Sequence, residues 1–219
     1  MKLTHTLLKL ATLAAALLLA SCATKPAYLL GPDGKPVTPE GDFINPFEPG
    51  TYEHFKAAKD YPKTKEVWRD ESLLSATNPD NARIIISRDK QRAFLMNGSL
   101  VAIDYPVSSG KPSRPTPAGE YTILEMTVDK SSNAYGKVYD AEGKRLSGVE
   151  TPDDVPEGGK FVGAPMPYWM RMTWDGVGHH IGYIPEGRYG ASHACIRGPR
   201  SVVPTVFSKV AKGTPVIVE

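Results

Sequence analysis

Three of the five histidines and one of the two cysteines stand in a single stretch, HHIGYIPEGRYGASHACIRGP, which covers residues 179–199. A cysteine is a strong nucleophile only as the thiolate, and a free thiol is only slightly ionised at neutral pH. A reactive cysteine therefore needs a base close by, and histidine is a suitable one. The stretch predicts nucleophilic catalysis by Cys195 with the help of a neighbouring histidine.

Two histidines are candidates for that base. His193 comes two residues before Cys195, so on an extended segment both side chains would point to the same face. His180 lies fifteen residues upstream of Cys195, and a strand followed by a returning loop would bring it beside the sulfur. The residue types alone do not rank the two. His179 would point opposite to His180 on a strand, so we expect it to have a structural role.

Two other interpretations do not involve nucleophilic catalysis. His180, His193 and Cys195 together are a conceivable zinc ligand set, although their spacing fits no common zinc pattern. A single buried cysteine more often behaves as a small apolar residue, and histidines in loops are usually surface groups. This last interpretation leaves one fact unexplained: the N-terminus, described next, indicates an exported protein, and such a protein would not be expected to keep one unpaired thiol.

The N-terminus has the pattern of an export signal. Its sequence, MKLTHTLLKLATLAAALLLASC, combines a lysine-bearing start, an apolar run over 10–20 and small residues before Cys22. The apolar run is short for a membrane span. The tetrapeptide LASC resembles the bacterial lipobox, which implies that residues 1–21 are removed and that Cys22 is diacylated; an ordinary signal peptide is the alternative. Cys195 would then be the one free thiol in a class of proteins whose cysteines normally pair.

Composition favours a mostly β globular fold and argues against a nucleic-acid partner. The chain is 41% hydrophobic and 23% charged, as in ordinary globular proteins. Twenty glycines and twenty prolines favour short strands joined by turns. Removal of residues 1–21 takes away Lys2 and Lys9 and no acid, which leaves 24 basic side chains against 24 acidic ones. A nucleic-acid-binding domain would need a basic excess.

Changes in composition predict four segments. Residues 1–21 are the signal peptide, and residues 22–50, rich in Pro, Gly and charge, are the lipid anchor and a flexible tether. Residues 51–80 are a lead-in with a short helix on each side of Pro62. We expect His54 there to be a solvated surface residue, because no second metal ligand stands at helical spacing. Residues 81–219 are the folded domain.

The folded domain has the pattern of a β-sheet with one late helix. Apolar runs over 83–87, 92–96 and 100–107, separated by RDKQ and Asn97-Gly98, predict a β-meander. PTPAGEYTILEMTV predicts a fourth strand, and YWMRMTWDGVGHHIGY predicts two more around an Asp175-Gly176 turn. The helical face after the cysteine consists of Val202, Val203, Val206, Phe207 and Val210. TPVIVE closes the chain as a strand.

The run Ser192-His193-Ala194-Cys195-Ile196-Arg197, with His180 upstream, resembles the catalytic signature of the L,D-transpeptidases, the YkuD-like family of peptidoglycan enzymes. The resemblance extends over about residues 81–219, because QRAFLMNGSLV, PVSSGKPSRPTPAGEY, HHIGYIP and GTPVIVE look like family segments in the family's order. It implies a YkuD-like β-sandwich or mixed sheet with one or two short helices, including one after the cysteine.

The resemblance also implies roles for the residues. Cys195 is the nucleophile and His180 the general base, while His193, Ser192 and the backbone N–H groups around Ala194 and Cys195 support the oxyanion. No metal or organic cofactor is implied. For Arg197 two interpretations stand equal: it binds an anionic stem peptide, or it braces backbone carbonyls.

Tyr168, Trp169 and Met170 flank the substrate groove by the same resemblance, although an aromatic pair on a strand is more often core packing. One residue departs from the family pattern. The family has glycine between the histidine and the cysteine, where this chain has Ala194. If the backbone needs a positive φ there, alanine adds about 1 kcal/mol of strain.

The resemblance therefore implies a lipid-anchored transpeptidase that forms a thioester with peptidoglycan stem peptides and passes the acyl group to an amine of a second stem peptide or a protein. Water in place of the amine would make a hydrolase. A non-catalytic peptidoglycan-binding lipoprotein, its site damaged at Ala194, is the second hypothesis. By resemblance to the sorting rules of Gram-negative lipoproteins, Ala23 in place of an aspartate that would retain the protein at the inner membrane implies the outer membrane, facing the periplasm.

Overall fold

The structure, a computed structural model, describes residues 29–219. The predicted signal peptide and the lipidation site Cys22 lie outside the described residues. Within 29–219, no helix is long and apolar enough to cross a membrane. The described chain divides into two compact units, with the boundary in the sequence between Ile44 and Asn45.

Residues 29–44 belong to the smaller unit and form a local β structure in part of the predicted tether. β1 (Leu29–Leu30) pairs antiparallel with β2 (Pro36–Val37), and Val37 also bridges to Phe43. The turn between the strands passes through Gly34, whose φ of 73° lies in the left-handed region that glycine adopts readily.

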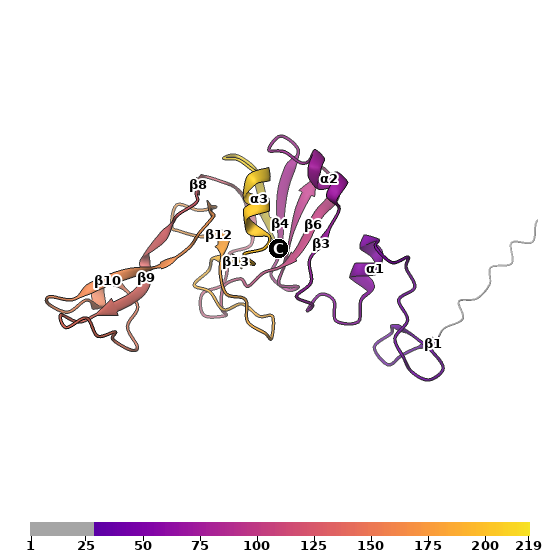
Figure 1. Cartoon of the computed structure of the whole chain (residues 1–219), viewed down its shortest axis with the longest axis horizontal. Helices are drawn as coiled ribbons and strands as arrows, with labels where there is room; N and C mark the ends of the chain where they lie inside the picture. Colours follow the sequence, from indigo (N-terminus) through magenta and orange to yellow (C-terminus); the bar gives the residue numbers. More distant parts are fainter. Residues whose placement is uncertain (1–28) are drawn as a thin grey trace, which may run out of the picture. The chain divides into compact units, whose positions relative to one another are not determined.

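The unit of residues 45–219 is mostly β with short helices, which confirms the predicted fold class (Figure 1). Its helices are α1 (Tyr52–Ala57), α2 (Glu71–Ala76), the 3₁₀ turn η1 (Pro152–Asp154) and α3 (Val203–Lys209). Its strands are β3 (Trp68–Arg69), β4 (Ala82–Ser87), β5 (Arg92–Asn97), β6 (Leu100–Pro106), β7 (Gly119–Thr122), β8 (Glu125–Thr127), β9 (Ser131–Tyr139), β10 (Lys160–Pro165), β11 (Trp169–Arg171), β12 (Gly178–Ile181), β13 (Ile196–Gly198) and β14 (Pro215–Val218). α1 and α2 lie on either side of Pro62, as predicted.

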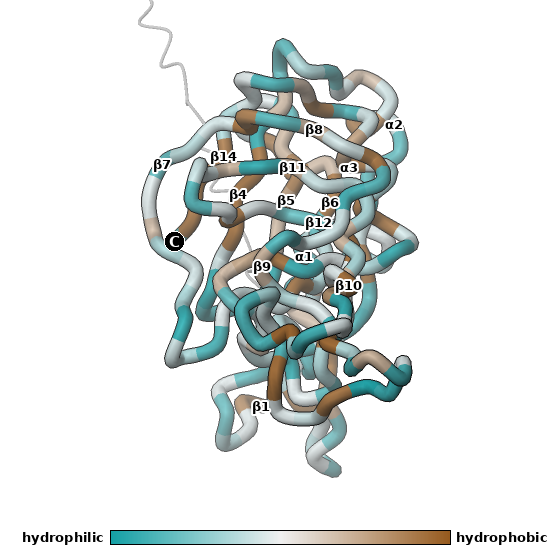
Figure 2. The backbone as a smooth tube through the Cα atoms, turned by 90° about the vertical axis from the view of Figure 1, so that its left-hand side faces the viewer, coloured by the Kyte–Doolittle hydropathy of each residue, from teal (hydrophilic) through white to brown (hydrophobic). Residues whose placement is uncertain are grey.

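A six-stranded sheet has the order β3-β6-β5-β4-β14-β7. Its centre is the predicted meander, because β4, β5 and β6 pair antiparallel in sequence order. The predicted C-terminal strand β14 joins it parallel to β4. Figure 2 shows hydrophobic residues on β4 and β14, where Ile84, Ile86 and Val216 are buried. This face of the sheet forms half of the core.

The prediction of one strand in PTPAGEYTILEMTV is wrong, because the segment forms two. β7 pairs with β14 in the six-stranded sheet, whereas β8 pairs with β11 in a second sheet. Between β7 and β8, the N–H of Ile123 donates to the backbone carbonyl of Thr214, and the N–H of Leu124 donates to the backbone carbonyl of Arg171. The chain thus crosses from one sheet to the other at residues 123–124, directed by partners distant in sequence.

The second sheet has four strands in the order β13-β12-β11-β8. β11 and β12 pair antiparallel around the predicted turn, where Gly176 has a φ of 102°. β13 adds parallel to β12. A parallel pair requires a crossover rather than a tight turn, and residues 182–195 provide it. This loop carries the predicted nucleophile back to Gly178, at the start of β12.

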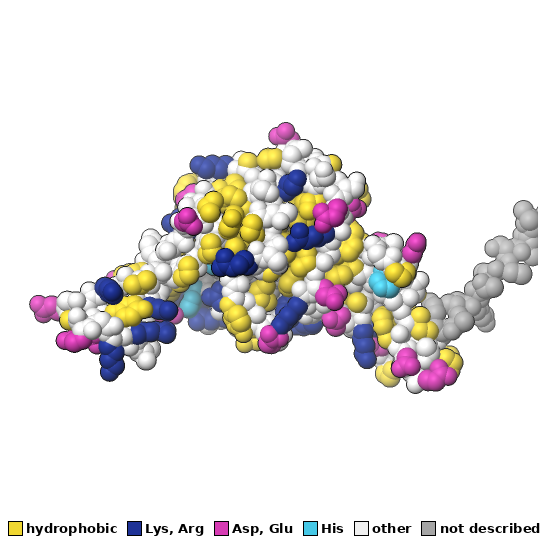
Figure 3. Space-filling view, in the orientation of Figure 1, with side chains coloured by type: hydrophobic (Ala, Val, Ile, Leu, Met, Phe, Trp, Pro, Cys, Tyr) yellow, Lys and Arg dark blue, Asp and Glu magenta, His cyan; other side chains and the backbone are white. Residues whose placement is uncertain are grey.

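β9 and β10 form a long antiparallel hairpin that the sequence analysis did not predict. Gly136 and Gly163 permit the two strands to approach closely: a Cβ on Gly136 would lie 2.2 Å from the Val162 carbonyl oxygen, and one on Gly163 would lie 1.9 Å from that of Ser132. Figure 3 shows both basic and acidic side chains at the outer end of the hairpin. Its inner end borders the site described below.

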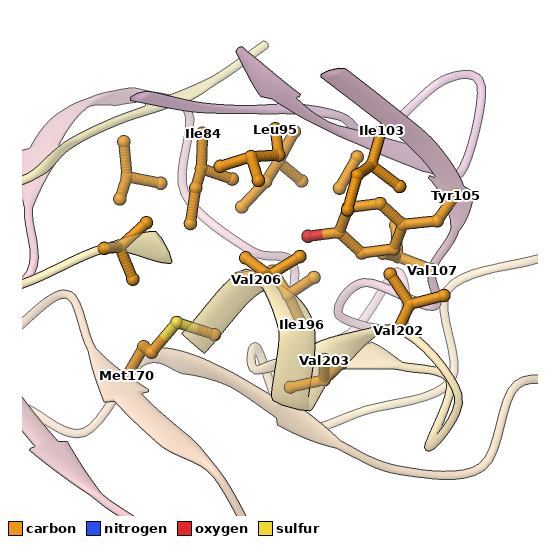
Figure 4. Close-up of a cluster of buried hydrophobic side chains, with 14 of the residues drawn as sticks. Ile84, Leu95, Ile103, Tyr105, Val107, Met170, Ile196, Val202, Val203 and Val206 are labelled. Carbon is orange, nitrogen blue, oxygen red and sulfur yellow. The ribbon is translucent and has the colours of Figure 1, made fainter. Parts of the chain in front are cut away.

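The hydrophobic core lies between the six-stranded sheet, α3 and the second sheet (Figure 4). Val202, Val203 and Val206 are fully buried, in agreement with the predicted helical face. They contact side chains of both sheets, represented by Ile103 and Ile196. Because α3 follows β13 directly, its burial fixes the strand that comes immediately after Cys195.

Buried charges attach the lead-in segment to the sheet. Arg92 and Asp104 are fully buried and form an ion pair, and Asp104 accepts hydrogen bonds from the hydroxyls of Tyr52 (3.0 Å) and Tyr61 (3.1 Å). Arg188, in the crossover loop, is also buried and donates to the carbonyl of Thr64. A buried charge without its partner costs about 3–5 kcal/mol. The segment around residues 52–64 therefore stabilises both the sheet and the crossover loop.

Candidate active site

The parallel pairing of β12 with β13 brings Cys195 and His180 to the same face of the second sheet. His180 pairs with Arg197, and Cys195 immediately precedes β13, two residues before Arg197. Side chains two residues apart on a strand point to the same side. Cys195, His180 and Arg197 all line one cleft. The strand and returning loop predicted from the sequence therefore place the thiol and this imidazole in a common cavity.

His180 is buried and held in one tautomer. Its Nδ1 lies 2.8 Å from the carbonyl oxygen of Ile181. Because a carbonyl only accepts, Nδ1 carries the proton and Nε2 keeps its lone pair. Burial lowers the pKa of His180 to about 4, partly opposed by the bond to Ile181. At neutral pH the ring is an uncharged imidazole that can accept a proton at Nε2.

Cys195 is half-buried and lines the cleft. Its thiol donates to the carbonyl of Gly176 at 3.5 Å, and the N–H of Gly178 donates to the sulfur. Burial raises the pKa of the thiol, and the Gly178 N–H and the guanidinium groups of Arg197 and Arg171 oppose that rise. The resting sulfur is therefore protonated at neutral pH, and its activation requires a base.

His179 faces the opposite side of the sheet, as predicted. It is buried, its Nδ1–H donates to the carbonyl of Ile196 at 2.9 Å, and its Nε2 lies 3.0 Å from the hydroxyl of Tyr105. Burial lowers its pKa to about 4. Both ring nitrogens are used within the core, so His179 ties β12 to β13 and to β6.

His193 does not share an extended segment with Cys195. Ala194, between them, has a φ of 83°, so the chain turns at this point and the alternation of side chains is lost. The ring of His193 stacks on Tyr135 of β9 with centroids 4.3 Å apart. Its Nε2 lies 3.0 Å from Lys111 Nζ and 3.1 Å from Glu150 Oε1. The extended segment on which the same-face alignment depended is therefore not formed, although His193 lines the same cleft as Cys195; its ring joins the crossover loop to the hairpin.

The positive φ of Ala194 fulfils the condition under which the alanine was expected to be strained. The peptide that follows is held on its carbonyl side, because Thr116 Oγ1 donates to the Ala194 oxygen at 2.6 Å. A trans peptide directs its C=O and N–H in opposite directions. Thr116 therefore fixes the direction of the Cys195 N–H.

Two further hydroxyl contacts hold this turn. The fully buried Thr116 also accepts from the Gly110 N–H at 2.9 Å, and the Ser192 hydroxyl donates to the Cys195 carbonyl. Ser192 thus acts on the backbone beside the sulfur. Thr116 is a residue that the sequence analysis missed, since PTPAGEYTILEMTV was interpreted only as the source of a strand.

Of the two residues predicted to bind substrate, Arg197 lines the cleft and Tyr168 does not. Arg197 lines the cleft, its stem covers Gly182, and its Nη1 lies 3.4 Å from the Ala191 carbonyl, so both predicted roles stay open. Tyr168 packs edge-on against Phe207 of α3, with centroids 5.4 Å apart, and is not among the cleft-lining residues. Trp169, its neighbour, does line the cleft and lies beside His180.

The cleft has a volume of about 950 Å³ and a basic wall. The charged side chains that line it are Arg114, Lys130, Arg171, Asp175 and Arg197. Arg171 is held by Glu125 at 2.9 Å and lies over the rings of Trp169 and Trp174. The sequence analysis missed Arg171 because its separation from Cys195 gives no local signal. Four basic groups against one acid favour an anionic ligand.

No group of three or more His, Cys, Asp or Glu side chains in residues 29–219 is arranged to hold a metal ion. The zinc arrangement of His180, His193 and Cys195 is accordingly not formed. The imidazole of His193 is engaged with Tyr135, Lys111 and Glu150 instead.

Comparison with known proteins gives one family and several relatives. A profile of the YkuD family, described as the L,D-transpeptidase catalytic domain, matches residues 81–218. Probable L,D-transpeptidase 3 of Mycobacterium tuberculosis is 32% identical over 120 residues, which make up 52% of this chain and 38% of that protein. This chain therefore spans less than half the length of that relative.

Solved structures with a similar fold include two L,D-transpeptidases. One, from Mycobacterium smegmatis, is 26% identical, with 64% of this chain and 58% of that chain covered and a TM-score of 0.47. The other, LD transpeptidase LdtMt1 in complex with imipenem, is 25% identical. The match covers 64% of this chain and 59% of that chain, with a TM-score of 0.48.

Proposed function

Because the chain belongs to the YkuD family of L,D-transpeptidase catalytic domains, we propose that it is a cysteine-dependent L,D-transpeptidase acting on peptidoglycan stem peptides. One observation carries the proposal: Cys195 and a neutral His180 lie on the same face of paired strands in a basic cleft. A protonated thiol and an uncharged imidazole that line the same cleft are the two groups that general-base activation needs.

In the acylation half-reaction, Nε2 of His180 takes the thiol proton as the sulfur attacks the carbonyl between diaminopimelate and a D-residue. In the resting state the S–H points to the Gly176 carbonyl, so a rotation about the Cβ–Sγ bond precedes the transfer. The tetrahedral oxyanion accepts hydrogen bonds from the backbone N–H groups of Ala194 and Cys195. Collapse breaks the C–N bond, and the leaving amine takes the proton from His180.

In the second half-reaction, an amine attacks the thioester and loses a proton to His180. The carbon–sulfur bond breaks, and the thiolate recovers that proton. The basic wall of the cleft suits the carboxylates of stem peptides. The acceptor is an amine of a second stem peptide or of a protein, and water at the same position would give hydrolysis.

The product profile tests this proposal. Purified protein incubated with tetrapeptide-bearing muropeptides should release the terminal D-residue and form cross-linked dimers or, when a different free D-amino acid is added, exchanged tetrapeptides, resolved by liquid chromatography and mass spectrometry. Tripeptides alone would show a hydrolase. Unchanged muropeptides, together with no imipenem adduct on the protein, would favour the non-catalytic binding protein.

The backbone at Ala194 supports one quantitative prediction. Glycine at this position should relieve about 1 kcal/mol of strain, which corresponds to about a fivefold faster acylation if the strain is felt only in the transition state. We expect the imipenem acylation rate of Ala194→Gly to rise a few-fold with little change in Tm.

Ala191→Gly is the matched control, because Ala191 is in the same loop but not at a positive φ. A hundredfold rise in Ala194→Gly would mean that the natural protein is nearly inactive, as the binding-protein hypothesis states. A slower reaction would refute the strain argument.

Thr116 provides a second prediction. Thr116→Val removes the hydroxyl that holds the Ala194 carbonyl, so the Cys195 N–H loses its fixed direction. Loss of a whole oxyanion donor costs about 10²- to 10³-fold, and a misdirected donor should cost less, about tenfold. The maximal acylation rate should fall while the half-saturating imipenem concentration stays the same. Thr116→Ser should restore the rate; equal losses in both variants would show that the hydroxyl is not needed.

We also propose that Cys22 anchors the protein in the outer membrane, facing the periplasm. The support is the lipobox-like LASC followed by Ala23. Cys22→Ala should leave the precursor unacylated and absent from the detergent-extracted lipoprotein fraction. Unchanged partitioning of this variant would rule out the anchor.

A further inference from the structure

The guanidinium group of Arg171 is held in the cleft, and one of its nitrogens has no protein partner. The side chain is only 16% exposed. Its Nε donates to Glu125 Oε2 at 2.9 Å, and its Nη1 lies 3.4 Å from the carbonyl oxygen of Thr173. Nη2 makes no hydrogen bond to any residue in 29–219. A largely buried cation with unused N–H groups can bind an anion strongly.

Two indole rings restrict the direction from which a ligand can reach this guanidinium. Its central carbon lies 5.6 Å from the ring centroid of Trp169 and 5.8 Å from that of Trp174. A cation this close to the face of a ring is attracted to it. The N–H edge of the guanidinium is therefore the part left for a ligand. A carboxylate binds to this edge in the plane of the group.

The strand register places Arg171 and the reactive sulfur in one row across the second sheet. Arg171 pairs with Gly178 of β12 on one side and with Glu125 of β8 on the other. The parallel register of β12 and β13 continues to Cys195, whose sulfur accepts from the Gly178 N–H. Neighbouring strands lie about 4.8 Å apart. The backbones of Cys195 and Arg171 are thus about 10 Å apart, two strand spacings.

An indole ring fills the position between them. A Cβ on Gly178 would lie 2.6 Å from Cη2 and 2.7 Å from Cζ3 of Trp169, so the ring of Trp169 covers this glycine. Trp169 is fully buried and lines the cleft. The row therefore passes from the thiol across an apolar ring to the guanidinium of Arg171, with no other charged side chain in between.

We infer that Arg171 binds the terminal carboxylate of the D-residue that leaves during acylation, an inference that rests on the proposed function. Reacting atoms approach to about 3 Å, and one residue spans at most about 3.6 Å. A charge-assisted hydrogen bond is about 2.8 Å long. A carboxylate one residue beyond the reacting carbonyl therefore bridges the distance between the sulfur and Arg171. The side-chain carboxylate of diaminopimelate is on a longer, flexible chain and would have to fold back to reach the same place.

This assignment makes Arg171 a residue that determines donor specificity. A stem peptide with one more residue has a neutral amide at the position of the carboxylate. The guanidinium would then lose its charged partner. The cleft should therefore select stem peptides that end one residue after the reacting carbonyl, and Glu125 has the positioning role of holding the guanidinium in the row.

Binding to Cys195→Ala tests the inference without turnover. The ligands are tetrapeptide, its C-terminal amide, and tetrapeptide amidated at the side-chain carboxyl of diaminopimelate. By calorimetry, we expect the C-terminal amide to bind about 10- to 100-fold more weakly than tetrapeptide, and the side-chain amide to bind within about threefold of it. Adding Arg171→Gln should weaken tetrapeptide to the level of the C-terminal amide and leave that amide unchanged. Arg114→Gln is the matched control, because Arg114 lines the same cleft but donates to Tyr135, and it should keep the ratio of the two affinities.

Three outcomes would overturn the inference: absent or equal binding of tetrapeptide and its C-terminal amide, a ratio that Arg171→Gln leaves unchanged, or a larger loss for the side-chain amide. The first comparison needs no change at Arg171, so it decides the question even if Arg171→Gln does not fold. Imipenem capture by the protein with Cys195 intact separates this failure from failure of the proposed function. An adduct together with any of the three outcomes would refute the role of Arg171 alone. No adduct would refute the transpeptidase, and the affinity ratio would still decide whether Arg171 binds the carboxylate.

Discussion

Alanine in place of Cys195 should abolish the covalent capture of imipenem. The strained lactam carbonyl of imipenem requires an attacking nucleophile, and Cys195 is the sole cysteine in residues 29–219. The natural protein should gain one imipenem by intact mass, and Cys195→Ala should gain none. Rates should fall below detection, since no other group can take the place of the sulfur.

The variant is a clean test because the thiol is small and only half-buried. Its melting temperature should stay within a few degrees of that of the natural protein, which would show that the loss is chemical. An adduct on Cys195→Ala of the same stoichiometry would place the nucleophile elsewhere and contradict the proposed mechanism.

The second large effect concerns the base. His180→Ala should slow imipenem acylation by about 10²- to 10⁴-fold, the range typical of a general base. Burial raises the pKa of Cys195, so without His180 little thiolate is available at neutral pH. Stopped-flow or mass-resolved acylation rates would measure the loss. Full activity of His180→Ala with loss in His193→Ala would reverse the assignment of the two histidines.

The pH dependence should separate general-base catalysis from a structural effect of His180. Its pKa, lowered to about 4, keeps the imidazole neutral above that pH, so the natural rate should be nearly constant from about pH 5.5 to 8. The rate should fall as the pH drops through about 4, because the protonated ring cannot accept the thiol proton. In His180→Ala the rate should instead rise about tenfold per pH unit between about 6 and 8, following the thiolate fraction. Parallel profiles would show that His180 is not the base.

Several elements were predictable because their signals are local. The meander β4–β6 follows from apolar runs separated by turns, and α3 follows from valines at helical spacing. The same holds for the opposite directions of His179 and His180, since alternation on one strand needs only two neighbouring residues. Cys195 and His180 were candidates from residue types, and the family resemblance ranked His180 above His193.

The elements that the sequence analysis missed depend on distant partners. The sheet change at Ile123 depends on Thr214 and Arg171, and nothing within the segment marks it. The β9–β10 hairpin has no clear apolar alternation, because much of it faces solvent. A periodic pattern of hydrophobic residues arises when one face of an element is buried. Where little of an element is buried, the pattern is absent and the element cannot be predicted from it.

The sequence by itself determined the mostly β class, the thiol and histidines that can do chemistry, and the family to which they belong. Only the tertiary structure decided how these groups act together. The positive φ of Ala194 turned His193 toward Tyr135, and Thr116, 78 positions away, fixed the peptide that bears the Cys195 N–H. Arg171 reached the same cleft from a neighbouring strand. Such contacts arise because packing brings together groups whose separation along the chain carries no pattern.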